Sequence, residues 1–196
     1  MFEVRIHGRG GQGVVTAAEL LSVAAFLEGR HAQAFPSFGS ERTGAPVVSF
    51  CRIDERPIRT HEPIVAPDAL IVVDPTLLHQ VDVFGGLEPD GWVLMNSSRS
   101  LEELQLTPLR ERSSHPERLV SVPASQIARE ALGRPLPNAA LLGAFAALTS
   151  AVSLSSVLAA IRGRFSEETA EGNVVAAERA FAAVRGPAAA LEASRA

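Results

Sequence analysis

A glycine-rich turn near the amino end constrains the fold of this chain more than any other stretch. Residues 6–16 carry glycines at positions 8, 10, 11 and 13. They follow residues 2–6, which alternate apolar and polar as a half-buried strand does, and precede residues 14–28, which favour a helix. Glycine tolerates positive φ and close approach, and the first N–H groups of a helix carry its positive dipole end. The turn is therefore a candidate anion site.

The glycines also have a simpler interpretation, in which they only let the helix pack tightly on the strand. Their spacing matches the dinucleotide-binding fingerprint, which needs an acidic residue at the end of the second strand to hold a ribose. That strand ends at residues 35–37, which contain no carboxylate. A nicotinamide or flavin dinucleotide is thus disfavoured, whereas a phosphate bound without a ribose contact is not. No lysine follows the last glycine, which excludes a nucleoside-triphosphate loop.

The rest of the chain alternates predicted strands and helices, and this pattern indicates an α/β fold. We expect a three-layer α/β/α sandwich around a mostly parallel, mixed sheet with a Rossmann-like glycine-rich first turn. The domain should span residues 1–185, with a flexible tail over residues 186–196. Strands are predicted over residues 31–35, 47–53, 69–73, 92–95 and 119–122, and further helices over residues 76–81, 126–132, 139–151, 154–164 and 167–184.

Two features place polar side chains at the ends of these strands. Residues 36–46 form a long, polar connection between two strands expected to be antiparallel, and loops of this length are more often functional than idle. Asp74, Asn96 and Ser125 each follow a predicted strand, where ligands of open α/β sheets gather. Helix capping is the simpler interpretation of each of the three.

The composition excludes several kinds of chemistry. All 18 basic residues are arginine, so Schiff-base and lysine-dependent phosphate chemistry are absent. The net charge of −4 argues against nucleic-acid binding, and the absence of a long apolar run or signal peptide predicts a soluble, cytoplasmic protein with no membrane contact. Cys51 is the single cysteine, and it lies in a strand-like run that favours a small buried residue. The five histidines show no metal-ligand spacing.

Four blocks of the sequence, in order, resemble the gamma subunit of 2-oxoacid:ferredoxin oxidoreductases, particularly of the pyruvate type. The resemblance covers about residues 2–185. The related small subunit of the indolepyruvate enzyme shares the glycine turn but is not expected to carry the second block. Thr43 departs from the pattern, because many relatives carry a second arginine there. The four blocks are residues 8–13, 34–46, 74–78 and 133–138.

The resemblance implies a subunit of a larger oxidoreductase. Such an enzyme decarboxylates a 2-oxoacid, here expected to be pyruvate, on thiamine diphosphate, transfers the acyl group to coenzyme A and passes electrons through [4Fe–4S] clusters to ferredoxin. One cysteine cannot hold a cluster, and no acidic site suits the Mg²⁺ of thiamine diphosphate. These groups are therefore expected on alpha, beta and ferredoxin-like delta partners in a hetero-oligomer, with no catalytic residue and no metal on this chain.

We expect this chain to help build the cleft by which coenzyme A reaches the active site, since an arginine fork suits diphosphate. Glu41 can instead pair with Arg42 or Arg9 and hold the loop. Two other classes stay open: an independent nucleotide-binding module, and an architectural subunit whose turn docks against a partner. The candidate cofactor-binding residues, from the turn and the loop, are Gly8, Arg9, Gly10, Gly11, Gln12, Gly13, Ser40, Glu41, Arg42 and Thr43.

Overall fold

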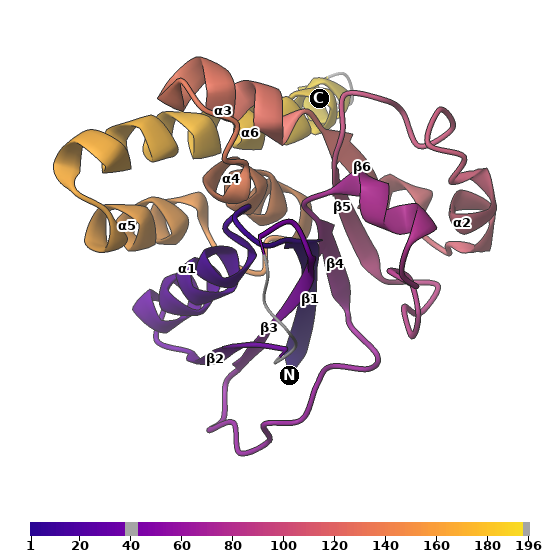
Figure 1. Cartoon of the computed structure of the whole chain (residues 1–196), viewed down its shortest axis with the longest axis horizontal. Helices are drawn as coiled ribbons and strands as arrows, with labels where there is room; N and C mark the ends of the chain where they lie inside the picture. Colours follow the sequence, from indigo (N-terminus) through magenta and orange to yellow (C-terminus); the bar gives the residue numbers. More distant parts are fainter. Residues whose placement is uncertain (38–42, 194–196) are drawn as a thin grey trace.

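The computed structural model describes residues 1–37 and 43–193, which form one six-stranded mixed sheet (Figure 1). The strand order is β2-β3-β1-β4-β5-β6. Strands β4, β5 and β6 run parallel to β1, whereas β3 lies antiparallel between β1 and β2. The predicted antiparallel pair and the predicted parallel strands are thereby confirmed. The strands are β1 (Phe2–Arg9), β2 (His31–Pro36), β3 (Pro46–Asp54), β4 (Ala69–Val72), β5 (Trp92–Asn96) and β6 (Leu119–Val122).

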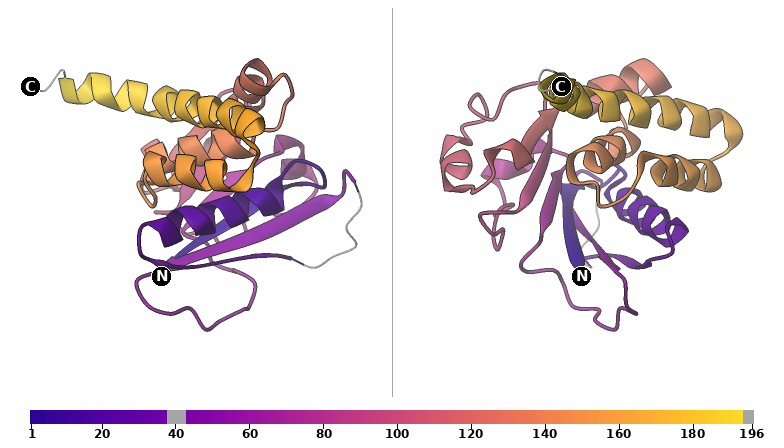
Figure 2. Two further views of the ribbon diagram at one scale, coloured as in Figure 1. Left: turned by 90° about the vertical axis from the view of Figure 1, so that its left-hand side faces the viewer. Right: turned by 180° about the vertical axis from the view of Figure 1, so that it is seen from behind.

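Helices cover both faces of the sheet, but unequally (Figures 1 and 2). Helices α1, α3, α4, α5 and α6 lie on one face, and the short α2 with the 3₁₀ turn η1 lies on the other. This confirms the predicted α/β fold with a mixed sheet between two helical layers. The helical elements are α1 (Val14–Leu27), η1 (Pro75–His79), α2 (Thr107–Arg112), η2 (Pro116–Arg118), α3 (Ala124–Leu132), α4 (Asn138–Thr149), α5 (Leu154–Arg164) and α6 (Glu167–Ala193).

Each face of the sheet has its own hydrophobic core. The larger one joins β1 and β4 to α1, α4, α5 and α6, with Ile6, Leu21 and Phe145 fully buried. A Cβ atom at Gly143 would collide with the backbone of Ala177, so the small residues of α4 let α6 pack directly against it, as the sequence predicts. The smaller core lies under η1, α2 and the segments that join them to the sheet. Both cores bury β4 and β5, which explains their almost entirely apolar sequences.

Three elements differ from the sequence predictions. The helix expected over residues 76–81 is the 3₁₀ turn η1, which Asp74 caps at its start and which ends at His79. Helix α2 was not predicted, since its six residues are exposed or half-buried and show no apolar period. The helix predicted over residues 167–184 continues to Ala193. The domain bounds at residues 1–185 and the flexibility of the tail stay predictions.

Candidate functional site

The four recognisable blocks of the sequence meet at the edge of the sheet where β1 and β4 end. The glycine turn leaves β1 and is bonded to the end of the 36–46 connection, since Gly10 N donates to the Ala45 carbonyl at 2.9 Å and Gly44 N donates to the Gly10 carbonyl at 3.2 Å. The third block supplies Asp74 and the fourth supplies Asn138. Chain segments far apart in sequence therefore build one site.

Each of three glycines of the turn is required for a different structural reason. A Cβ at Gly8 would lie 2.5 Å from Cγ2 of Val14, so this glycine lets α1 pack on the sheet. Gly13 has φ of 75°, and its Cβ would lie 2.8 Å from Nδ2 of the buried Asn138. Gly11 has φ of 94° with no described atom near its Cβ position, and it is exposed. The packing interpretation thus holds for Gly8 and Gly13, while Gly11 needs glycine only for its backbone conformation.

A polar network surrounds the Arg9 guanidinium. Its Nε donates to Oδ2 of Asp74 at 3.0 Å, and its terminal nitrogens donate to the Gly44 carbonyl at 3.0 Å, to Oγ1 of Thr76 at 2.8 Å and to Oε1 of Gln80 at 3.0 Å. Most donors of this arginine are therefore used within the chain. The predicted contact of Arg9 with an anionic ligand stays a prediction, and this geometry gives the side chain a structural task first.

Gln12 ties the same network to the turn itself. Its Oε1 accepts from Arg9 N at 2.7 Å, and its Nε2 donates to Oδ2 of Asp74 at 2.8 Å. Burial acts to raise the pKa of Asp74, but hydrogen bonds from Thr76 and Gln12 and the charge of Arg9 outweigh it and hold that pKa below its ordinary value. Asp74 is therefore an ionised acceptor at neutral pH.

The three polar residues at the strand ends have separate roles. Asp74 caps η1, as the simpler interpretation predicts, by accepting from Thr76 N at 2.9 Å. Asn96 instead reaches a helix distant in sequence: its Oδ1 accepts from Ser125 N in the first turn of α3 at 3.0 Å, and its Nδ2 donates to the Val73 carbonyl and to Oγ of Ser125. Ser125 lies inside α3 and is not its cap. Asn138, which directly precedes the helix predicted over residues 139–151, is likewise the first residue of α4 and not its cap.

Two open cavities flank the glycine turn. One, of about 510 Å³, lies over the start of α1. The other, of about 720 Å³, lies beyond Gln12 at the ends of β4, β5 and β6. The turn is therefore accessible from both sides. The first cavity is lined by Arg9, Gly10, Gly11, Gly13, Val14, Val15, Thr16, Thr43 and Val47. The second is lined by Gln12, Val73, Asp74, Pro75, Asn96, Ser97, Ser98, Pro123, Ser125, Gln126, Arg129, Glu130, Pro135 and Pro137.

The structure brings Arg9, Gly10, Gly11, Gly13 and Thr43 around one cavity, with Gln12 facing the second. Gly8, the remaining predicted turn residue, is buried and lines neither cavity. Ser40, Glu41 and Arg42 lie outside the described residues, so their predicted roles, including a Glu41 pair with Arg42, are untested. Arg9 pairs with Asp74 among the described side chains. Sequence reasoning recognised the block around Asp74 but not its link to Arg9, because no local spacing joins residues that lie 65 positions apart.

Other titratable groups lie away from this site. Cys51 is fully buried, which confirms the prediction of a small buried residue, and its burial raises the pKa of the thiol to about 12. Across residues 1–37 and 43–193, no three His, Cys, Asp or Glu side chains are grouped so as to hold a metal ion. In the same residues no helix has the length and hydropathy needed to cross a membrane.

Comparisons with known proteins show the family to which this chain belongs. Residues 3–183 match the family model described as pyruvate ferredoxin/flavodoxin oxidoreductase. The chain is 51% identical over 181 residues to the pyruvate/ketoisovalerate oxidoreductases common subunit gamma of Pyrococcus abyssi, covering 92% of this chain and 96% of the relative. It is 44% identical to the pyruvate synthase subunit PorC of Methanothermobacter thermautotrophicus, covering 92% and 94%. The crystal structure of pyruvate oxidoreductase subunit PORC from Thermotoga maritima superposes with a TM-score of 0.76 at 34% identity, covering 92% and 94%.

Proposed function

Because the chain belongs to the pyruvate ferredoxin/flavodoxin oxidoreductase family, as a gamma-type subunit, we propose that its glycine turn lines the path of coenzyme A in such a complex. In this proposal the holoenzyme oxidises pyruvate or a similar 2-oxoacid to acyl-CoA and CO2 and passes the electrons to ferredoxin. Thiamine diphosphate, Mg²⁺ and the [4Fe–4S] clusters belong to alpha, beta and delta partners. The described residues of this chain, with one buried cysteine and no acidic cluster, do not suit these groups.

The observation that carries the proposal is the start of α1. This helix has 14 residues, no described side chain caps its first N–H groups, and its first turn holds no acidic residue. Those residues open onto the cavity of about 510 Å³. Unpaired N–H groups at the positive end of a helix dipole favour a phosphate. The helix start, rather than the Arg9 side chain, then supplies the attraction for the diphosphate of coenzyme A.

The name of one relative also supports a site for a co-substrate that several reactions share. The Pyrococcus protein is a subunit common to pyruvate and ketoisovalerate oxidoreductases. Coenzyme A takes the acyl group in both reactions, so a subunit that serves this step has no need to distinguish the two 2-oxoacids. We propose that the choice of 2-oxoacid is made by the partner subunits.

Thr16→Glu tests the proposal, because Thr16 lies in the first turn of α1 and lines the cavity. A carboxylate there stabilises the helix through its dipole but occupies and repels the anion site, so the KM for coenzyme A should rise about ten-fold. The neutral Thr16→Gln is the matched control and should change that KM by less than about three-fold. The assay uses the assembled complex, with the KM for the 2-oxoacid measured alongside.

The results separate the alternatives. Equal KM values for the two variants would show that no anion binds at this helix start. An architectural role predicts instead that Thr16→Glu lowers the amount of complex recovered, while the complex that does form has wild-type kinetics. An independent nucleotide-binding module predicts that the isolated chain binds NAD, FAD or a nucleotide with micromolar affinity in calorimetry.

A further inference from the structure

The Asp74 carboxylate does more than cap η1. Its Oδ1 accepts from N and Oγ1 of Thr76 at 2.9 and 2.7 Å, which is all that the cap requires. Its Oδ2 accepts from Nε of Arg9 at 3.0 Å and Nε2 of Gln12 at 2.8 Å. One oxygen therefore serves the cap, and the other serves the glycine turn.

The contacts of Oδ2 extend to the far side of the turn. Arg9, fixed by Asp74, also donates to the Gly44 carbonyl at 3.0 Å, and Gly44 N donates to the Gly10 carbonyl at 3.2 Å. Gln12 closes the other side by accepting from Arg9 N at 2.7 Å. Hydrogen bonds through the Arg9 and Gln12 side chains thus connect Asp74 to backbone atoms on both sides of the glycine turn.

We propose that Asp74 is the positioning residue of the glycine turn. Through Oδ2 it holds Arg9 and Gln12, and through Arg9 it holds Gly44 against Gly10, so the cavity at the start of α1 keeps its shape. The kinetic consequence of this inference rests on the proposed function, whereas its geometric part does not.

The Asp74→Asn variant tests the roles of the two carboxylate oxygens separately. An asparagine can keep its Oδ1 as the acceptor from Thr76, but Nδ2 in place of Oδ2 puts a donor opposite the donors of Arg9 and Gln12. The η1 cap should survive while the turn loses its anchor. Glu130→Gln is the matched control, because it removes the same charge from the lining of the larger cavity but has no bond to the turn.

The first readout is hydrogen exchange at the Gly10 and Gly44 amides in the full chain, which requires no ligand. Exchange at both should be about ten-fold faster in Asp74→Asn and unchanged in Glu130→Gln. The second readout is the KM for coenzyme A in the assembled complex, which should rise about five-fold while kcat stays within about two-fold of the wild type.

Arg9→Lys tests whether the turn is held by the shape of the Arg9 guanidinium or only by its positive charge. Lysine keeps the positive charge but cannot reach the four acceptors that the guanidinium fork joins. It should reproduce both effects of Asp74→Asn, and wild-type behaviour of Arg9→Lys would overturn the inference. So would unchanged exchange at Gly10 and Gly44 in Asp74→Asn. Faster exchange with an unchanged KM would support the positioning role and refute the coenzyme A path instead.

Discussion

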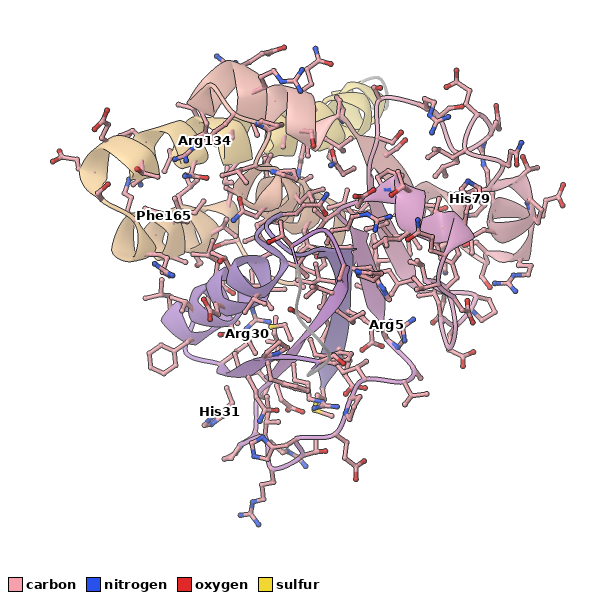
Figure 3. All side chains as sticks on the ribbon, in the orientation of Figure 1. Arg5, Arg30, His31, His79, Arg134 and Phe165 are labelled. Atoms are coloured by element: carbon pink, nitrogen blue, oxygen red, sulfur yellow. The ribbon has the colours of Figure 1, made fainter. Side chains whose placement is uncertain are left out.

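Two arginines on the same face of β1, Arg5 and Arg9, have opposite surroundings. Arg5, whose side chain is labelled in Figure 3, is 8% exposed. It donates to Nε2 of His7 and to backbone carbonyls of Ile64, Val65, Val83 and Gly85. Arg9 lies at the open end of the strand and pairs with the Asp74 carboxylate. Arg5 therefore holds two chain segments against the sheet, and no carboxylate of the described residues contacts it directly. Arg9 holds together the edge of a cavity.

The comparison shows that the partners of an arginine, rather than the arginine itself, decide whether it stabilises the interior or shapes the candidate site. Burial lowers the pKa of Arg5, with Asp82 acting in the opposite sense, and burial followed by the charge of Arg5 lowers the pKa of His7 to about 4. These groups sit in the interior and their bonds fix the fold. The Arg9 network is only partly buried and adjoins two cavities.

The largest expected effect is the loss of stability in Arg5→Met. Four carbonyls lose their donor in a mostly buried place, and we expect a loss of about 3 kcal/mol or more in the free energy of unfolding. Arg9→Met should lose only about 1 kcal/mol, because its partners Gly44, Thr76 and Gln80 are exposed to water. Urea unfolding of the isolated chain measures both. Equal losses would break the distinction between the two arginines.

The next effect concerns pH and belongs to His7. Its pKa is about 4 in the folded chain and near 6.5 when unfolded, so the unfolded state takes up a proton first as the pH falls. Stability is full above pH 6.5 and should decline by up to about 3 kcal/mol as the pH falls to 4.

His7→Gln is the control for this pH effect, since its amide oxygen can still accept from Nε of Arg5 without titrating. Denaturant midpoints of the two proteins, measured from pH 7 to pH 4, should converge toward the acid end. Parallel curves would show that His7 does not set the acid sensitivity of the scaffold.

Smaller effects than those at Arg5 and His7 are expected at two glycines of the turn. In Gly13→Ala the new Cβ is strained by the positive φ and collides with the Asn138 side chain, so the free energy of unfolding should fall by about 2 kcal/mol. In Gly11→Ala only the positive φ causes strain, and the fall should be about 1 kcal/mol. Adding Asn138→Ala to Gly13→Ala removes the collision and should recover part of the loss. No recovery in the double variant, measured by thermal unfolding, would mean that this contact does not constrain the turn.

Local patterns in the sequence were enough to predict most of the fold. The turn between β1 and α1, the β2–β3 hairpin and the apolar strands β4 to β6 all follow from periodicity and glycine placement. Helix α2 was missed because an exposed six-residue helix leaves no apolar period to detect. The 3₁₀ form of η1 was missed because its helical signal ends after one turn.

The site was predictable in its parts but not in its connections. The glycine turn, the 36–46 connection and Asp74 were each recognised, and the cap formed by Asp74 was foreseen. The second oxygen of Asp74, the cap that Asn96 gives to α3 and the packing of Asn138 on Gly13 depend on chain segments that only the folded sheet brings together. Such contacts produce no recognisable spacing pattern in the sequence.

The antiparallel placement of β3 has one more consequence. The chain leaves the sheet at Pro36 and re-enters it at Pro46, directly beside Arg9, and the pairing of β3 with its two neighbours fixes both points. Lengthening such a connection adds little closure entropy. A change in the length of this connection should therefore leave the strand register intact, which makes the hairpin a suitable point for insertions.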